Sequence, residues 1–257
     1  MTVLPEGSAA IILAAGKGTR MQSELPKVAV QLAGRPLIRY VLEATLGAGV
    51  GRIVVVVGFR RDLVAAAIGE LPVQLAVQEE QRGTGHAVLM AAPLLPDQLG
   101  PVVVLAGDIP LIRAATIAEL IRHHARTGAA VTVLTADLAD PTGYGRIVRD
   151  PSGRVTGIVE EKDATPEIRR IREINSSIYA FDWSFLEPAL GRLTSRNAQG
   201  EFYLTDTLQM AVAGGRLVEA IKVVEAAEVS GVNTVEQLAE LEVVRIRMDG
   251  SGSGVVR

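Results

Sequence analysis

The sequence predicts an α/β protein built on a doubly wound, mostly parallel sheet, with an inserted antiparallel β portion and a C-terminal helix. Three observations support this. Short apolar β-type runs alternate with segments of helical periodicity over residues 9–136. The run 52–58 is continuously apolar, which is typical of a strand covered on both faces. The pattern changes after that, and residues 143–163 resemble an antiparallel hairpin.

The first half contains a regular series of strands and helices. A glycine-rich turn follows the first strand, and apolar residues then recur at helical spacing from Leu37 to Ala48. The next helices are expected from Arg61 to Gly69, after "RGTGHAV", and around Ile117–Ile121. The strands are expected at 9–15, 52–58, 73–78, 101–108 and 129–136.

The second half completes a single domain, residues 1–248. The hairpin turns at Pro151–Gly153, and a long strand is expected at 173–181. The remaining elements are helices at 183–191, 203–214 and 234–248 and a strand near 217–224. We expect the Gly/Ser-rich residues 249–257 to form a flexible tail.

Composition excludes several classes of function. The 257 residues are 48% hydrophobic and 21% charged, which is typical of a globular protein. A net charge of −3 gives no reason to expect a nucleic acid or an anionic membrane as partner. The lack of cysteine excludes disulfides, thiolate zinc sites and cysteine nucleophiles. No apolar run could span a bilayer and no secretory signal is visible, so we expect a cytoplasmic protein.

Polar residues gather where the expected parallel strands end. Residues 16–27 follow the first strand, residues 78–84 follow the third, and Asp108 closes the fourth. Ligands of doubly wound sheets bind at the carboxyl ends of the strands. The sequence therefore predicts the functional site at this edge.

The turn "AAGKGTRM" fits neither of two well-known phosphate-binding fingerprints. Met21 stands where a dinucleotide fingerprint needs its third glycine. In a Walker A loop the lysine follows the last glycine, whereas here Lys17 precedes Gly18. The turn alone is compatible with a simple tight turn that needs glycine.

A cluster of cations favours a phosphate-binding role for the same turn. Lys17, Arg20 and Lys27 lie within eleven residues at the end of the first strand. Glycines let backbone N–H groups approach an anion, which lysine and arginine then neutralise. A triphosphate would suit such a loop.

Other polar residues favour structural interpretations. We expect His86 to be a packing or capping residue, and His123 and His124 to face solvent. No histidine has the partner spacing of a metal site. The charged run Glu161–Asp163 is interpreted as a solvated hairpin end.

The segment "LAAGKGTRMQSELPKV" resembles the signature of sugar-nucleotide pyrophosphorylases. Further segments make the resemblance specific to N-acetylglucosamine-1-phosphate uridyltransferases, over roughly residues 8 to 247. They are "QEEQRGTGHAV", "GDIPL", "DPTGYGRIV", "GIVEEKDAT", "EINSSIY", "NAQGEFYLTD" and "GVNTVEQLAELE".

The resemblance implies a reaction and a cofactor. UTP and N-acetylglucosamine 1-phosphate would give UDP-N-acetylglucosamine and pyrophosphate, a step in peptidoglycan precursor synthesis, with Mg²⁺ as cofactor. The sugar phosphate oxygen would attack the α-phosphorus in line. Such chemistry needs two anions held together and their charge neutralised.

The resemblance also implies roles for individual residues. Arg20 would bind the leaving pyrophosphate and Lys27 would bridge the two reacting phosphates, as catalytic cations. Asp108 and Asn233 would bind Mg²⁺, although Asn233 also stands where it could cap the last helix. The sugar would contact Gly145, Glu160, Asn175 and Tyr203. The nucleotide would contact Leu13, Ala14, Ala15, Gly16, Gly18, Thr19, Gln78, Gln81, Gly83 and Thr84.

The sequence departs from the family pattern at two small positions and at its end. Ala106 replaces an aromatic found in some relatives, and Ser177 stands where we expect glycine or another small residue. No hexapeptide repeat of the β-helical acetyltransferase domain is present. We therefore expect no acetyltransferase activity in this chain and favour a monomer. Two alternatives stay open: the same chemistry on glucose 1-phosphate or dTTP, and a catalytically silent ligand-binding subunit.

Overall fold

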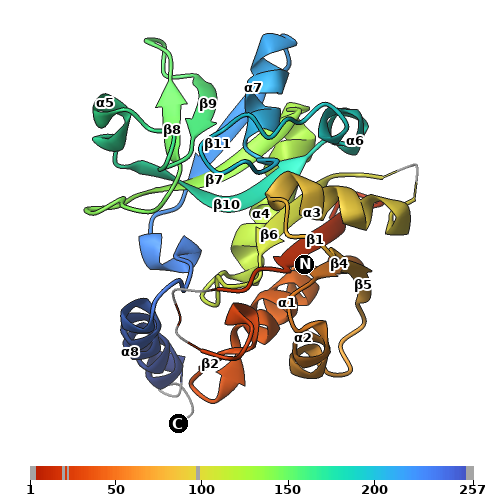
Figure 1. Cartoon of the computed structure of the whole chain (residues 1–257), viewed down its shortest axis with the longest axis vertical. Coiled ribbons are helices and arrows are strands. Elements are labelled where there is room, and N and C mark those ends of the chain that lie inside the picture. Colours follow the sequence, from red (N-terminus) through yellow and green to blue (C-terminus); the bar gives the residue numbers. More distant parts are fainter. Residues whose placement is uncertain (1–3, 19–20, 22, 97–98, 253–257) are drawn as a thin grey trace.

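A computed structural model describes residues 4–18, 21, 23–96 and 99–252 of the chain. A nine-stranded sheet forms its centre, with strand order β11-β7-β10-β6-β1-β4-β5 and with β8 and β9 attached to β10 (Figure 1). A short hairpin of β2 and β3 lies outside this sheet. The strands are β1 Ala9–Ala14, β2 Gln31–Leu32, β3 Arg35–Pro36, β4 Arg52–Val57, β5 Gln74–Val77, β6 Val102–Ala106, β7 Val131–Asp137, β8 Arg146–Arg149, β9 Val155–Val159, β10 Glu173–Phe181 and β11 Val218–Lys222.

Helices connect the strands and cover the sheet. They are α1 Leu37–Gly47, α2 Arg61–Ile68, α3 Thr84–Ala91, α4 Ala114–Thr127, α5 Pro166–Arg169, α6 Trp183–Leu190, α7 Asp206–Ala213 and α8 Val235–Gly252. Short 3₁₀ turns lie at Lys27–Ala29, Ala92–Leu94 and Ala226–Val229. Over the described part of the chain, no helix has the combination of length and apolarity that a bilayer crossing needs.

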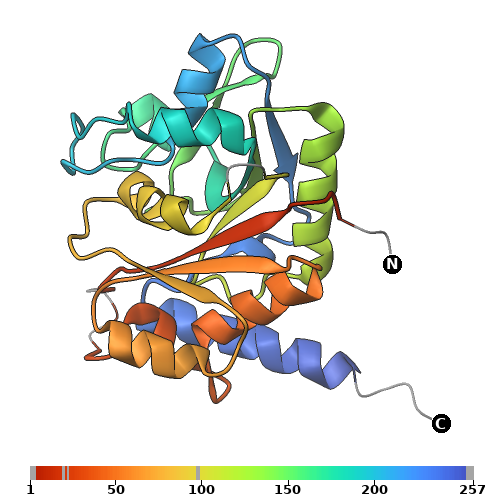
Figure 2. The same cartoon turned by 90° about the vertical axis from the view of Figure 1, so that its right-hand side faces the viewer.

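Two hydrophobic layers, one on each face, hold the sheet between the helices. In β1, Ile11 belongs to one layer and Ile12 to the other, because successive strand residues point to opposite faces. Helices α1, α2 and α4 contribute to the Ile12 layer, and α3, α6 and α7 contribute to the Ile11 layer. Figure 2 shows helices on both sides of the sheet. The prediction of a doubly wound sheet is confirmed.

Strand β10 is the antiparallel insertion. It lies between β6 and β7 and runs antiparallel to both, while β6, β1, β4 and β5 are parallel to one another. Its start also pairs with β8, the first strand of the hairpin. The β7–β10 register shifts between Asn175 and Tyr179, where Ser177 has a φ of 62°. This bulge lies at the edge of the sheet where ligands are expected.

The last helix lies apart from the sheet and packs against the β2–β3 hairpin (Figure 1). Its residue Leu241 joins a small apolar cluster with Leu32 and Tyr40. The helix extends to Gly252, four residues beyond the expected end at Met248. Adding residues to an existing helix needs no new nucleation, so an unfavourable Gly/Ser composition does not stop it at once. Residues 253–257 lie outside the described residues.

Candidate active site

A cavity of about 240 Å³ lies at the carboxyl ends of β1 and β6 and brings together residues that are far apart in the sequence. Strands β1 and β6 are neighbours, so the residues that follow them meet at one edge. The bulge of β10 and the loop before α8 close the cavity from the other side. Of the residues expected in the site, the cavity is lined by Leu13, Ala14, Gly16, Lys27, Thr84, Asp108, Gly145, Glu160, Asn175 and Asn233.

Lys27 is held between the two expected metal ligands. Its ammonium forms an ion pair with the Asp108 carboxylate and lies 3.0 Å from Asn233 Oδ1. The main-chain N–H of Val232 donates to the carbonyl of Asp108, at 3.0 Å, and so ties the loop before α8 to the end of β6. Asp108 is only 6% exposed. The Asp108 carboxylate oxygen and the Asn233 amide oxygen, both hard ligands, therefore converge on the Lys27 ammonium.

Asn233 lines the cavity, while its neighbour Thr234 caps the helix. Thr234 Oγ1 accepts from the Gln237 N–H at 3.2 Å, and Gln237 Oε1 accepts from the Asn233 N–H at 2.8 Å. Thr234 therefore acts as the N-cap of α8, and the Gln237 side chain reaches back to the residue before the cap, a variant of the capping box. Thr234 thus supplies the cap that we considered for Asn233.

The glycine-rich turn after β1 packs directly on Lys27. Gly18 has a φ of 66°, and a Cβ placed on it would lie 2.5 Å from the Cβ of Lys27. Only glycine allows this conformation and this approach together. Lys17 points elsewhere, with Nζ 5.4 Å from the centre of the Phe59 ring. The expected ligands Thr19 and Arg20 lie outside the described residues.

A second pocket adjoins the first and contains the amides expected to read the base. It shares Leu13, Gly16 and Thr84 with the central cavity. Gly83 has a φ of 106°, and a Cβ there would lie 2.6 Å from the carbonyl oxygen of Phe202, so the turn into α3 requires glycine. The expected residues that line this pocket are Leu13, Ala15, Gly16, Gln78, Gln81, Gly83 and Thr84.

Three expected sugar ligands meet on the opposite side of the central cavity. A Cβ on Gly145 would lie 3.3 Å from Glu160 Oε2 and 3.5 Å from the Cβ of Asn175, so the three residues are neighbours. Thr205 donates its hydroxyl to Glu160 Oε1 at 3.0 Å. Burial raises the pKa of the Glu160 carboxyl, and the nearby Asp163 and Asp206 add to this rise. Asn175 Oδ1 accepts from the Ser177 N–H at 3.0 Å, which fixes it on the bulge.

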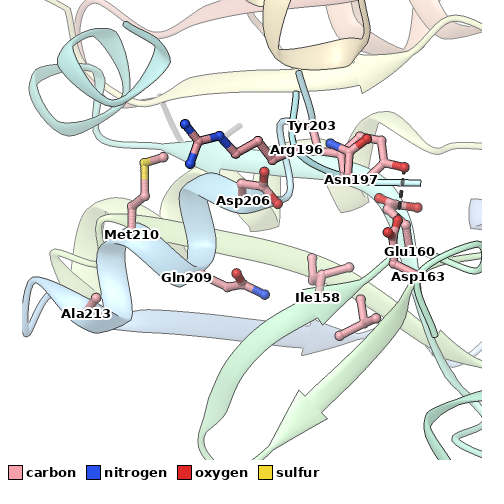
Figure 3. A pocket seen from close by; sticks show the side chains of 11 residues that line it. Ile158, Glu160, Asp163, Arg196, Asn197, Tyr203, Asp206, Gln209, Met210 and Ala213 are labelled. Carbon is pink, nitrogen blue, oxygen red and sulfur yellow. Dashed lines mark hydrogen bonds between the residues drawn. The ribbon is translucent and has the colours of Figure 1, made fainter. Parts of the chain in front are cut away.

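Tyr203 lies outside the central cavity. It lines a neighbouring pocket that meets the cavity at Glu160 (Figure 3). Its hydroxyl donates to Asp163 Oδ2 at 3.1 Å and accepts from Gln199 Nε2 at 2.8 Å. Helix α7 begins at Asp206, three residues later than expected, and the Leu204 N–H before it donates to Thr84 Oγ1.

Two structural expectations are wrong. His124 does not face solvent: it is 3% exposed, and its Nδ1 lies 2.9 Å from Thr132 Oγ1, because the apolar face of α4 turns it onto the sheet. Glu161 is not simply a solvated charge, since it pairs with Arg146 at 2.8 Å. Arg146 itself is only 1% exposed. A lone arginine at the start of a strand gave no sequence signal that it would be buried.

Sequence reasoning missed other residues that line the central cavity. Ser176 and Ser177 reach it through the bulge, and Gly143 and Tyr144 come from the loop before β8. Gly231 packs between the candidate metal ligands, since a Cβ there would lie 3.4 Å from Asp108 Oδ2 and 3.6 Å from Asn233 Nδ2. The available signal was that these residues lie within or next to the segments "GYG", "EINS" and "GVN".

Comparison with known proteins identifies the family. A model of the family described as nucleotidyl transferase matches residues 9–226. The chain belongs to the nucleotidyl transferase family. Members of this family generally use a divalent metal ion.

Within the nucleotidyl transferases, several curated relatives are about half identical to this chain. The bifunctional protein GlmU of Pelotomaculum thermopropionicum is 50% identical over 234 residues, which cover 91% of this chain and 51% of the relative. The bifunctional protein GlmU of Trichlorobacter lovleyi is 52% identical over 233 residues, which cover 90% and 51%. The chain therefore spans about half the length of the curated relatives it matches.

A solved nucleotidyl transferase structure shares the fold. A UDP-glucose pyrophosphorylase in complex with UDP-glucose superposes with a TM-score of 0.74, covering 94% of this chain and 99% of that one. Its sequence identity is 18%, so the likeness concerns the fold.

Proposed function

We propose that this chain transfers UMP from UTP to N-acetylglucosamine 1-phosphate, releasing pyrophosphate. One observation carries the proposal: Lys27 lies beside Asp108 and Asn233 in the central cavity, which Glu160 and Asn175 also line and which the amide-lined pocket adjoins. A nucleotide and a sugar phosphate placed in the two pockets would meet at this cation. The identity of about 50% with GlmU proteins supports the choice of substrates. The product would supply activated amino sugar for peptidoglycan.

The proposed reaction needs no covalent intermediate on the protein, because one bond forms and one bond breaks at the same phosphorus. A phosphate oxygen of the sugar phosphate forms a bond to the α-phosphorus of UTP. The bond from that phosphorus to the oxygen that bridges the α- and β-phosphates breaks, and pyrophosphate leaves with the electron pair. Lys27 would touch both reacting phosphates and lower their mutual repulsion. The main-chain N–H groups of the turn after β1 would bind the nucleotide phosphates.

The donor set at the central cavity fits Mg²⁺. Asp108 and Asn233 offer a carboxylate and an amide oxygen, and both already contact one cationic group, Lys27. Among the described residues, no group of three or more His, Cys, Asp or Glu side chains could hold a metal ion. Mg²⁺ suits a site with few protein ligands, because it keeps water and substrate phosphates in its shell. When bound, it would supply charge neutralisation at the phosphates.

The amide-lined pocket and the central cavity each have the chemistry of the substrate group proposed for them. Gln78 and Gln81 carry amides, which both donate and accept and so can bind the imide edge of uracil. Glu160 would accept from sugar hydroxyls, and Asn175 would bind the N-acetyl group or a hydroxyl. Tyr203 lies outside the central cavity, so it would act on the sugar through the neighbouring pocket, which it lines together with Glu160.

The decisive experiment is pyrophosphate release by the purified chain. UTP with N-acetylglucosamine 1-phosphate is compared with UTP plus glucose 1-phosphate and with dTTP plus either sugar, each with Mg²⁺ and with EDTA. We expect the highest kcat/KM for the first pair and loss of turnover in EDTA. Higher kcat/KM with glucose 1-phosphate or dTTP would assign a different substrate. No release with any pair would favour a silent ligand-binding subunit.

A further inference from the structure

The side-chain amide of Gln78 is held in one orientation. Gln78 is 2% exposed, and its Nε2 lies 3.1 Å from the carbonyl oxygen of Gly83 and 3.0 Å from His86 Nδ1. A carbonyl oxygen can only accept, so the amide atom facing Gly83 must be the nitrogen. Both N–H bonds of the Gln78 amide are then occupied, one by the Gly83 carbonyl and one by His86.

His86 must act as an acceptor in this arrangement. One hydrogen of Gln78 Nε2 goes to Gly83 and the other points at His86 Nδ1, so Nδ1 carries no proton. Turning the amide over would place its oxygen against the Gly83 carbonyl, and also against the Nδ1 lone pair as long as His86 keeps the tautomer that accepts from Gln78 Nε2. His86 therefore adds to the preference for the observed orientation.

The position of His86 is itself fixed by the chain around it. His86 lies in the first turn of α3, and its ring packs near Phe202, with centroids 6.4 Å apart. The Gly85 N–H donates to the Phe202 carbonyl at 2.8 Å, and the Leu204 N–H donates to Thr84 Oγ1 at 3.0 Å. These bonds tie the start of α3 to residues 202–204 and keep His86 beside Gln78.

The free end of the Gln78 amide is its oxygen. Gln78 lines the amide pocket, and within the described residues no donor reaches Oε1. An oxygen in this place accepts from a base that presents an N–H group. Uracil presents N3–H in the middle of its edge, where cytosine presents an unprotonated nitrogen that would repel the oxygen.

We propose that His86 is a positioning residue that turns the Gln78 oxygen toward the base and thereby makes the site select uridine over cytidine nucleotides. This inference rests on the proposed function, because it places the base in the amide pocket. It replaces the expectation that His86 only packs or caps. The cap position of α3 is Gly83, and no side chain caps the helix.

The test uses two variants of similar size. His86→Leu removes the acceptor, whereas His86→Asn keeps an oxygen that can take the place of Nδ1. His123→Leu, on α4, is the matched control for loss of a histidine elsewhere. For each protein, kcat and KM are measured with UTP and with CTP, and the KM for N-acetylglucosamine 1-phosphate is measured separately.

For His86→Leu we expect the KM for UTP to rise about 5- to 10-fold and the UTP/CTP ratio of kcat/KM to fall about 10-fold, as expected from one lost hydrogen bond of about 1 kcal/mol or slightly more. The kcat and the KM for the sugar phosphate should stay within about twofold. His86→Asn should recover most of the loss. An unchanged UTP/CTP ratio in His86→Leu, or equal losses in both variants, would overturn the inference.

Two further measurements keep the inference separate from folding and from the proposed function. If His86→Leu fails to fold, His86→Lys replaces it, because an ammonium can only donate and should lower the UTP/CTP ratio in the same way. If the wild-type chain shows no turnover, the proposed function fails, and calorimetric binding of UTP and CTP to the same proteins then decides the inference. Equal binding of both nucleotides by the wild-type chain would reject it.

Discussion

At the scale of single residues, Lys27 has the most demanding position in the site. Its stem packs against Gly18, and its ammonium contacts both Asp108 and Asn233. A buried carboxylate needs a partner charge, and here the partner comes from a residue that is 81 positions away in the sequence. Lys27 thus joins the turn after β1, the end of β6 and the loop before α8.

Replacing Lys27 by alanine should lower kcat by about 10²- to 10³-fold, since a cation directed at the reacting phosphates acts mainly in the transition state. The KM for N-acetylglucosamine 1-phosphate should change much less. Lys17→Ala is the matched control, because Lys17 lies in the same turn but over the Phe59 ring. Steady-state kinetics of both variants check this, and equal activity of Lys27→Ala and wild type would remove Lys27 from the mechanism.

Glu160 should give sugar binding a pH dependence. Burial raises the pKa of this carboxyl, so on acidification it gains a proton at a higher pH than an ordinary glutamate does. The KM for the sugar phosphate should therefore rise as the pH falls, because the neutral carboxyl is a weaker acceptor. Glu160→Gln should raise the KM about 10-fold at neutral pH and remove this part of the pH dependence.

Comparing wild type with Glu160→Gln separates the protonation of Glu160 from the protonation of the sugar phosphate. The sugar phosphate also gains a proton on acidification, and this affects both proteins equally. Parallel KM–pH curves for wild type and Glu160→Gln would show that Glu160 does not cause the effect.

At the scale of elements, the bulge of β10 forms one wall of the site. The strand pairs regularly with β7 on either side of residues 175–179 and loses register between them. Ser177 takes a φ of 62° there, and its N–H donates to Asn175 Oδ1. The bulge thus orients Asn175 at some cost in backbone strain, which a glycine at position 177 would avoid.

The strain at Ser177 predicts an order of stability for two variants. Ser177→Gly and Ser177→Ala both remove the hydroxyl, but only glycine adopts the left-handed conformation without penalty. Ser177→Gly should therefore be more stable than Ser177→Ala by about 1 kcal/mol in the free energy of unfolding. Urea denaturation of the two proteins measures this, and an alanine variant at least as stable as the glycine variant would contradict it.

At the scale of the whole molecule, His124 couples stability to pH. It is buried against the sheet as a neutral ring, and burial lowers its pKa from 6.5 to about 4, although Asp182 opposes this. Between pH 6.5 and about 4, His124 therefore carries a proton in the unfolded chain but not in the folded chain. Stability should fall as the pH drops from 6.5 toward 4, by about 3 kcal/mol if the full shift is expressed.

The His124 contribution is isolated by difference. The free energy of unfolding is measured in urea from pH 4.5 to 7.5 for wild type, His124→Gln and His123→Gln. His124→Gln should flatten the curve in this range. His123→Gln removes only one of the smaller causes of the low pKa of His124, after burial, so it should keep most of the slope. Equal slopes in wild type and His124→Gln would contradict the argument.

Much of the fold followed from local patterns. The strand at 173–181 and the hairpin around Pro151–Gly153 lie where alternation and turn residues place them. The helix at 203–214 starts late, and the last helix runs past its expected end, because side-chain bonds and packing decide helix ends. His124 was placed wrongly because the sequence neighbourhood of a histidine does not reveal what the sheet brings against it.

The sequence by itself determined the alternation of strands and helices, and with it the edge of the sheet at which Gly16, Lys27, Gln78 and Asp108 gather. Chain direction and apolar periodicity are local properties, so they can be read from neighbouring residues. Only the tertiary structure decided that Lys27 lies between Asp108 and Asn233, that Arg146 is buried against Glu161, and that His86 holds the Gln78 amide. Hydrogen bonds and ion pairs depend on distances of a few tenths of an ångström between atoms on different elements, which no local pattern contains.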